Sequence, residues 1–444
     1  MKKIIMTLAL CGLAGASFAQ NLNRELDSVM NAYQKVQHFN GSVLVAKNGR
    51  VLLEKGYGCK NFQAKTLNDA HTVYMIASVT KPFTSAVVLK LIAQHQLALN
   101  DPLTKFFPNY PNGDKVTIYN LLTHTAGIPN YTLDSVFMAT HRGLKVSDAL
   151  IQYGKSDFAP GTNWKYSNQG YQLLGEIIAR VSKMSYFQAV RHYIFQPLHM
   201  THSGFDFAAL KSPDKATGYW TYPENGKNRE ATIIDSAASF SAGAIYSTIG
   251  DMYKWHRGLQ AYQIVLKALM DQAYTPFKNH YGFGWFIDSL YGKRVLSHSG
   301  DTWGFKSNIA RVTEDDVCLI LLNNIEDEEM RGPLTNDLLA VLYHQPYQLP
   351  AYHQEITLDE QILKQYIGTY ELAPGLSAVI SLDKEGLWVA PGGQQPSRIY
   401  AYGKNRFFSK VVDAEVEFIT GNDGKVTGLA VTQGGHRMEG KKLN

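Results

Sequence analysis

The sequence predicts an α/β fold followed by a small antiparallel β-barrel. Segments towards both ends of the first 345 residues alternate apolar and polar side chains as strands do, and apolar residues between them recur at helical spacing. The remainder consists of short alternating segments separated by turn residues, which is typical of all-β domains. These three observations indicate one sheet built from both chain ends, an inserted helical region and a terminal barrel.

The N-terminal part of this sheet is expected at residues 42–57. Valine and leucine alternate with polar residues there on both sides of Asn48-Gly49, a pair that favours the type I′ turn of a β-hairpin. A helix should begin near Ser78, because the run Phe83–Ala93 is almost wholly apolar and Pro82 is tolerated only in a first turn.

Later segments complete the main domain, which we place at residues 20–345. Residues 173–181 have helical spacing, and strand character returns in Tyr281–Trp285, Arg294–His298 and Val317–Leu322. Another helix should follow, with Pro333 near its first position. A mixed sheet accounts for this order. Two independent domains are the alternative, but a lone N-terminal hairpin would be marginally stable.

Residues 346–356 carry proline and tyrosine with little periodicity, which indicates a linker. Residues 357–444 then predict a barrel of roughly eight strands, because turns such as Asn422-Asp423-Gly424 split short segments there. Examples of these segments are Ala378–Leu382, Leu387–Ala390, Arg398–Tyr402, Arg406–Val411, Glu415–Ile419 and Val426–Val431.

Residues 1–19 have the pattern of a signal peptide. Lys2 and Lys3 precede a short apolar stretch, and Ser17-Phe18-Ala19 places small residues where a signal peptidase cleaves. The stretch is too short for a stable membrane anchor. We therefore expect a periplasmic or secreted protein.

Charge and metal-ligand spacing exclude several function classes. The net charge of +5 is too small to indicate nucleic acid as a partner. His199 and His202 have no further ligand at metal-binding spacing, so we expect neither a metal nor another cofactor. Outside the leader, Cys59 and Cys318 either form a disulfide or, as we slightly prefer, are separate buried thiols.

Three short motifs carry the chemistry. Ser78 and Lys81 lie three apart at the start of the expected helix, so their side chains share one face, and an apolar setting would lower the pKa of the amine. Tyr166 and Asn168 form the second motif, and His298-Ser299-Gly300 forms the third. A serine nucleophile, a base and a site-lining strand are what hydrolysis through an acyl-enzyme needs.

Other copies of these patterns lack the right context. Ser212 and Lys215 repeat the first spacing without an apolar helix behind them, and Tyr110 lies in a Pro/Asn/Gly-rich loop. The nearest approach to a Gly-x-Ser-x-Gly elbow, residues 239–243, lacks its first glycine, which argues against an α/β-hydrolase.

The second motif leaves alternatives open. To act as a base near pH 7, Tyr166 would have to lose about three units of pKa, whereas a neutral phenol could relay a proton between Ser78 and the leaving group. Asn168 either binds a substrate amide or caps the helix of residues 173–181.

With these motifs the chain resembles the β-lactamase-related serine hydrolases, which include class C β-lactamases, D-alanyl-D-alanine carboxypeptidases, D-aminopeptidases and related esterases. The likeness runs from Gly41 to Leu342 and includes further segments at residues 121–128, 160–161, 166–171, 197–200 and 247–251. It implies a β-lactamase/transpeptidase-like domain, with an antiparallel sheet, flanking helices and an all-helical subdomain. It also implies a lipocalin-like barrel that opens near residues 366–370.

The resemblance also implies roles for single residues. Ser78 would be the acylated nucleophile, and Lys81 and Tyr166 would share the base and acid roles. The backbone N–H groups of Ser78 and Asp301 would form the oxyanion hole. We add His298 to the catalytic residues and assign substrate binding to Asn168, Ser299, Gly300 and Trp303.

One departure from the family pattern bears on the substrate. β-Lactamases usually carry lysine where this chain has His298, and Asp301 adds a carboxylate beside the site. Both changes disfavour an anionic β-lactam and fit a peptide with a free amine, or an uncharged ester. The sequence thus predicts an exported serine hydrolase that acts on a small-molecule or peptide substrate, a cell-wall peptide among the candidates. The alternatives are a penicillin-binding-type sensor with little turnover and a true β-lactamase.

Overall fold

The computed structural model describes residues 2–141, 144–221, 229–326, 330–350, 353–392, 396–409, 414–433 and 436–443. By its internal contacts the chain divides into two compact units. One comprises Met1–Arg24 and Asn40–Glu326, and the other comprises Glu25–Phe39 and Asp327–Asn444. All the residues that we predict for the site lie in the first unit. The predicted domain boundaries at residues 20, 345 and 357 stay predictions.

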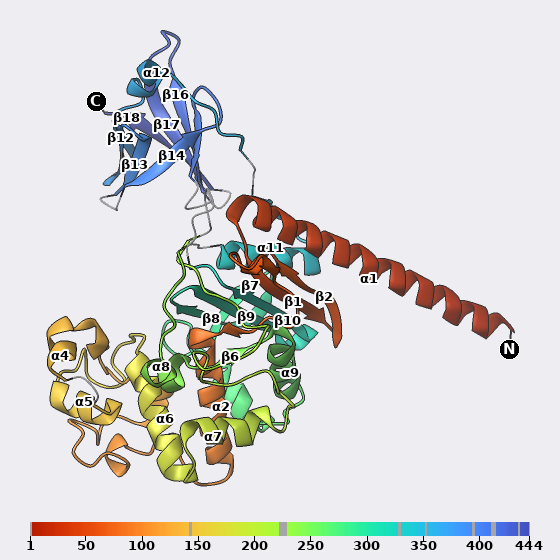
Figure 1. The fold of residues 1–444 in the computed structure, drawn as a ribbon, viewed down its shortest axis with the longest axis vertical. Helices are drawn as coiled ribbons and strands as arrows, with labels where there is room; N and C mark the ends of the chain where they lie inside the picture. Colours follow the sequence, from red (N-terminus) through yellow and green to blue (C-terminus); the bar gives the residue numbers. More distant parts are fainter. Residues whose placement is uncertain are drawn as a thin grey trace. The chain divides into compact units, whose positions relative to one another are not determined.

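The first unit is organised around a six-stranded sheet with the order β2-β1-β10-β9-β8-β7 (Figure 1). Its strands are β1 Gly41–Lys47, β2 Arg50–Tyr57, β7 Phe286–Leu290, β8 Lys293–Thr302, β9 Phe305–Val312 and β10 Val317–Asn323. Every neighbouring pair is antiparallel, so the expectation of a mixed sheet is wrong. The N-terminal hairpin pairs with β10, which confirms that both ends of this unit build one sheet.

Glycine and asparagine explain two local features of the sheet. Asn48 and Gly49 have φ values of 52° and 71°, as the type I′ turn requires, which confirms the predicted hairpin. Tyr281–Trp285, in contrast, is not a strand, because Gly284 has a φ of +80° and an added Cβ at Gly282 would lie 2.2 Å from the Ala273 carbonyl oxygen. The strand β7 begins only at Phe286.

Helices and two small sheets make up the rest of the first unit. The helices are α2 Thr80–Ala93, α3 Ile118–Leu122, α4 Ser135–Thr140, α5 Val146–Tyr153, α6 Asn168–Ser182, α7 Tyr186–Val190, α8 Ser236–Gly243, α9 Ile249–Gln260 and α10 Lys267–Ala273. The strand β3 Cys59–Asn61 pairs with β4 Thr66–Leu67, and β5 Tyr74–Met75 pairs with β6 Tyr246–Ser247. The helix α2 is buried on nearly all sides, as its apolar run predicts.

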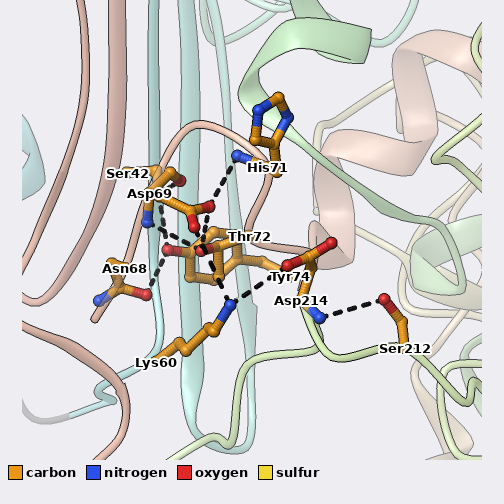
Figure 2. A network of polar contacts seen from close by, with 9 residues as sticks. All are labelled: Ser42, Lys60, Asn68, Asp69, His71, Thr72, Tyr74, Ser212 and Asp214. Carbon is orange, nitrogen blue, oxygen red and sulfur yellow. Dashed lines mark hydrogen bonds and ion pairs between the residues drawn. The ribbon is translucent and has the colours of Figure 1, made fainter. Parts of the chain in front are cut away.

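A buried polar network holds the chain just before Ser78 (Figure 2). The Tyr74 hydroxyl, on β5, donates a hydrogen bond to Asn68 Oδ1 at 2.7 Å and lies 2.7 Å from the Ser42 hydroxyl of β1. Nearby, Lys60 Nζ forms an ion pair of 3.2 Å with Asp214. Since Tyr74 is fully buried, these contacts tie β5 to β1 of the large sheet and fix the approach to the nucleophile.

The first helix, α1 Lys2–Gln37, runs through the predicted signal peptide without a break. Among the residues that the structure describes, every helix falls short of the length and apolar character that crossing a bilayer requires. Cleavage after residue 19 stays a prediction. Cys59 and Cys318 are both free thiols, as we preferred, although Cys59 is only partly buried.

The second unit contains α11 Arg331–Leu342, α12 Glu360–Lys364 and a closed eight-stranded barrel. The barrel strands are β11 Gly368–Ala373, β12 Leu376–Asp383, β13 Gly386–Pro391, β14 Ser397–Ala401, β15 Arg406–Ser409, β16 Ala414–Thr420, β17 Val426–Gln433 and β18 His436–Lys442. This confirms the predicted barrel, and Pro333 lies in the first turn of α11 as expected. Part of the predicted segment Arg406–Val411 lies outside the described residues.

Candidate active site

The serine nucleophile lies on a sharp turn between a strand and a helix. Ser78 occupies the 3-10 turn η1 Ala77–Val79, which joins β5 to α2. Ala77 has a positive φ of 46°, which is unusual for alanine and makes the chain reverse abruptly. Ser78 is half-buried in this turn, and first-turn N–H groups such as its own lack intrahelical acceptors. The position suits a nucleophile whose own peptide N–H faces the reacting carbonyl.

Lys81 is the partner that the spacing predicts. Its Nζ lies 3.1 Å from Ser78 Oγ, 2.8 Å from Asn168 Oδ1 and 2.9 Å from the Ala242 carbonyl oxygen. The side chain is fully buried, and desolvation by burial lowers the pKa of its amine well below the ordinary value. Lys81 is therefore suited to accept the Ser78 proton as a neutral amine.

Tyr166 lies on the other side of the nucleophile. Its ring centroid is 4.7 Å from Lys81 Nζ, and its hydroxyl is hydrogen-bonded to the Ser78 side chain. Burial raises the pKa of the phenol above its ordinary value, and the hydrogen bond from Ser78 offsets this only in part. The phenol therefore stays protonated near pH 7. Of the two roles left open by the sequence, this favours the proton relay over the anionic base.

Asn168 has a different local role from the one that helix patterns suggest. Ser167, not Asn168, caps α6, since its hydroxyl accepts a hydrogen bond of 3.1 Å from the Gly170 N–H. Asn168 is the first helical residue, and its amide oxygen accepts from Lys81. The Asn168 N–H in turn donates to Asn130 Oδ1 at 3.1 Å, a contact that the sequence did not reveal. The capping alternative is thus wrong, and Asn168 holds the Lys81 amine in place, whereas its binding of a substrate amide stays a prediction.

His298 lies behind the phenol rather than beside the nucleophile. Its Nδ1–H donates to the Ser299 carbonyl oxygen at 2.6 Å, and its Nε2 accepts from the Tyr281 hydroxyl at 3.1 Å. Burial lowers the pKa of the imidazole to about 3. The ring is therefore neutral at pH 7. Its centroid lies 6.3 Å from that of Tyr166, which makes it a packing neighbour of the phenol.

Gly300 lets β8 approach the nucleophile turn. An added Cβ would lie 2.2 Å from the Ile76 carbonyl oxygen, and the Ser307 hydroxyl of β9 donates to that same oxygen at 2.7 Å. In the register of β8 and β9, Asp301 lies opposite Lys306, one position before the pair that closes the two-residue turn. Such a position is not hydrogen-bonded across the two strands, so the Asp301 N–H points away from β9. The oxyanion-hole assignment to Ser78 and Asp301 stays a prediction that this geometry fits.

A pocket of about 390 Å³ opens beside Ser78. Asn168, Asp301 and Trp303 line it, together with Thr132, Gln169, Gln172, Ala242 and Glu326, which the sequence did not single out. Ser299 does not line it, and Gly300 contributes through backbone packing. Tyr281 and Trp285 are buried in the core, whereas Trp303 is 46% exposed. The missed residues lie on four separate parts of the chain, namely a 3-10 turn, the helices α6 and α8 and the segment after β10, so no local motif marks them.

Comparison with known proteins identifies the lineage. A family model described as "Beta-lactamase" matches residues 26–344, and a domain of unknown function, DUF3471, matches residues 353–442. The chain belongs to the beta-lactamase family. It is 29% identical over 433 residues to "Penicillin-binding protein 4*" of Bacillus subtilis, covering 91% of this chain and 95% of the relative. A "Putative penicillin-binding protein PbpX" of the same organism is 30% identical and covers 70% of this chain and 77% of its own.

Solved structures share the fold. An octameric penicillin-binding protein homologue from Pyrococcus abyssi superimposes with a TM-score of 0.66 at 24% identity, covering 93% of this chain and 99% of the other. D-amino acid amidase from Ochrobactrum anthropi gives a TM-score of 0.61 at 21% identity, covering 73% and 99%. At such identities these two structures establish the fold alone. Together with the family match, the site makes this beta-lactamase-family protein a serine hydrolase.

Proposed function

We propose that this protein is an exported hydrolase that opens an amide or ester bond, in a peptide with D-residues or in a small ester, through an acyl-enzyme on Ser78. The observation that carries the proposal is the contact between Ser78 and a fully buried amine, whose pKa burial lowers well below its ordinary value. Lys81 Nζ lies 3.1 Å from the hydroxyl and is held there by Asn168 and the Ala242 carbonyl. Such a pair activates a serine that is otherwise a weak nucleophile.

The acylation step follows from these contacts. The Lys81 amine accepts the Ser78 proton while Oγ forms a bond to the substrate carbonyl carbon, and the backbone N–H groups of Ser78 and Asp301 stabilise the oxyanion. On collapse the bond to the leaving group breaks, and the leaving nitrogen or oxygen takes a proton from Tyr166. The phenol regains a proton from the Lys81 ammonium, whose nitrogen lies 4.7 Å from the centre of the Tyr166 ring. Water then attacks the acyl-enzyme by the reverse proton path and releases the acid.

The charge around the site supports the substrate class. His298 is neutral and buried, so it cannot supply the cation with which a lysine would hold a substrate carboxylate. Asp301 adds a carboxylate that forms an ion pair of 2.8 Å with Lys306. Neither residue favours an anionic β-lactam. The D-amino acid amidase and the amidohydrolase described as "D-stereospecific" share this fold, which makes amides of D-residues the first class to test.

A second candidate is a penicillin-binding protein that is acylated but turns over slowly. The likeness to "Penicillin-binding protein 4*" over 91% of the chain favours it. A labelled penicillin separates the two cases. Stoichiometric labelling of Ser78 that persists for hours favours a binding protein, whereas loss of the label within minutes favours an enzyme.

Replacing the nucleophile tests the chemistry. Ser78→Ala should abolish hydrolysis of a p-nitrophenyl ester, because no other hydroxyl contacts Lys81 among the described residues. The matched control is Ser212→Ala in the second Ser-x-x-Lys copy, which should retain wild-type activity. Circular dichroism should show both variants folded. Near-wild-type activity in Ser78→Ala would place the nucleophile elsewhere.

We also propose that residues 1–19 are removed on export, as their composition suggests. N-terminal sequencing of the protein recovered from its native host should then begin at Gln20. Recovery of a chain that begins at Met1 or Lys2 would contradict export by this route.

A further inference from the structure

The two acidic side chains that line the pocket differ in whether a basic side chain forms an ion pair with them. Among the described residues, Asp301 and Glu326 are the ionisable side chains that line it. The Asp301 carboxylate is balanced by Lys306 at 2.8 Å. Glu326 accepts a hydrogen bond of 3.0 Å from the Gly304 peptide N–H, and no basic side chain of the described part of the chain forms an ion pair with it. Within the described residues, the pocket therefore presents one carboxylate without a counter-charge.

That carboxylate is fixed next to an aromatic wall. Trp303 and Gly304 form the two-residue turn between β8 and β9, so the hydrogen bond from Gly304 places Glu326 against the turn that carries Trp303. Gly304 has a φ of +77°, and an added Cβ would lie 2.6 Å from the Ala231 side chain, so the turn is closely packed. Trp303 is 46% exposed, with its ring 5.7 Å from that of Trp220. Its exposed surface is available to a ligand.

Two further side chains on the pocket wall have unused acceptors. Gln169 and Gln172 line the pocket and are 1% and 5% exposed, and the Oε1 atom of each lacks a hydrogen-bond partner among the described residues. The Gln172 Nε2 donates to the Ala238 carbonyl oxygen at 2.7 Å, which fixes the orientation of that amide. Buried acceptors are rarely left without donors. A ligand rich in N–H groups would suit this wall.

We propose that Glu326 and Trp303 form a subsite for the protonated amine of the substrate. The ammonium would form an ion pair with Glu326 and lie against the Trp303 ring, a combination of charge and π-face that recognises cationic ligands. The inference rests on the proposed function and narrows it to amides, peptides or esters that carry a free amine near the scissile bond. Glu326 and Trp303 are thus specificity residues, distinct from the catalytic group of Ser78, Lys81 and Tyr166.

Equilibrium binding tests the subsite without requiring turnover. Benzylamine, protonated at pH 7, and benzyl alcohol have nearly the same shape, and isothermal titration measures the affinity of each. The wild-type protein should bind benzylamine about tenfold more tightly, since a hydrogen-bonded ion pair in a partly buried site contributes on this scale. Glu326→Gln keeps the oxygen that accepts from Gly304, and it should reduce the ratio to within about twofold.

A matched control and a second variant complete the design. Glu314 is an exposed carboxylate paired with Arg294 at 3.7 Å and does not line the pocket, so Glu314→Gln should leave the ratio unchanged. Trp303→Leu should weaken the binding of benzylamine more than that of benzyl alcohol. This variant tests the subsite if Glu326→Gln does not fold. Equal affinities in the wild type, or an unchanged ratio in Glu326→Gln, would overturn the subsite. Neither result would touch the proposed acyl-enzyme chemistry on Ser78, which fails if Ser78→Ala remains active.

Discussion

Changing Asn168 to aspartate should inactivate the base without removing it. The Asn168 oxygen lies 2.8 Å from Lys81 Nζ, and at that separation two unit charges attract by about 6 kcal/mol at an effective dielectric constant of about 20. The new carboxylate stabilises the ammonium form of Lys81, which cannot accept the Ser78 proton. Even a quarter of that energy, about 1.5 kcal/mol, raises the pKa of Lys81 by about one unit. At pH values where the ammonium form dominates, the fraction of neutral amine then falls about tenfold.

The assay is kcat/KM for a p-nitrophenyl ester between pH 5 and 10. Burial lowers the pKa of Lys81, so wild-type activity should be present at neutral pH and be lost only as the pH falls through that lowered value. In Asn168→Asp the acid limb should move to higher pH, with activity partly restored at alkaline pH. The control Gln169→Glu adds the same charge to the pocket without a bond to Lys81. An unchanged acid limb in Asn168→Asp, or an equal shift in the control, would refute Lys81 as the base.

Two further predictions concern packing and acid stability. Gly300→Ala should lower kcat at least tenfold, because the added Cβ would lie 2.2 Å from the Ile76 carbonyl oxygen. The control Gly332→Ala, which has open space around the added Cβ, should leave kcat unchanged. Equal kcat values for the two variants would contradict this prediction. Burial lowers the pKa of His298 to about 3 and that of His256 to about 2, so the unfolded chain binds protons below pH 6.5 that the folded chain does not. The free energy of unfolding should therefore fall by about 1.4 kcal/mol per histidine for each pH unit below 6.5, as urea titrations at pH 6.5 and 5 would measure. Equal stability at the two pH values would contradict it.

Short sequence patterns correctly predicted those features whose residues lie close together in the sequence. The serine and its lysine share one helix, so spacing alone brings Ser78 and Lys81 together, and Asn48-Gly49 determines its own turn. The strand assigned to Tyr281–Trp285 was wrong, because alternation of aromatic and glycine residues mimics a strand where the glycines instead permit turns and close contacts.

The rest of the site depends on tertiary contacts that no spacing encodes. The contact between Asn168 and Lys81 joins α6 to α2, and Ser167 takes the capping role that was one of the two alternatives for Asn168. The charge state of His298 follows from its burial, which the motif does not specify. Glu326 reaches the pocket from the chain after β10, with only a hydrogen bond to Gly304 to mark it.

The central claim is that one hydroxyl, paired with a buried neutral amine, becomes covalently acylated. A fluorophosphonate probe followed by peptide mass spectrometry tests it most directly. The account predicts one adduct per chain, on Ser78, and none in Lys81→Met under the same conditions. Modification of any other residue at comparable yield, or full labelling in the lysine variant, would contradict it.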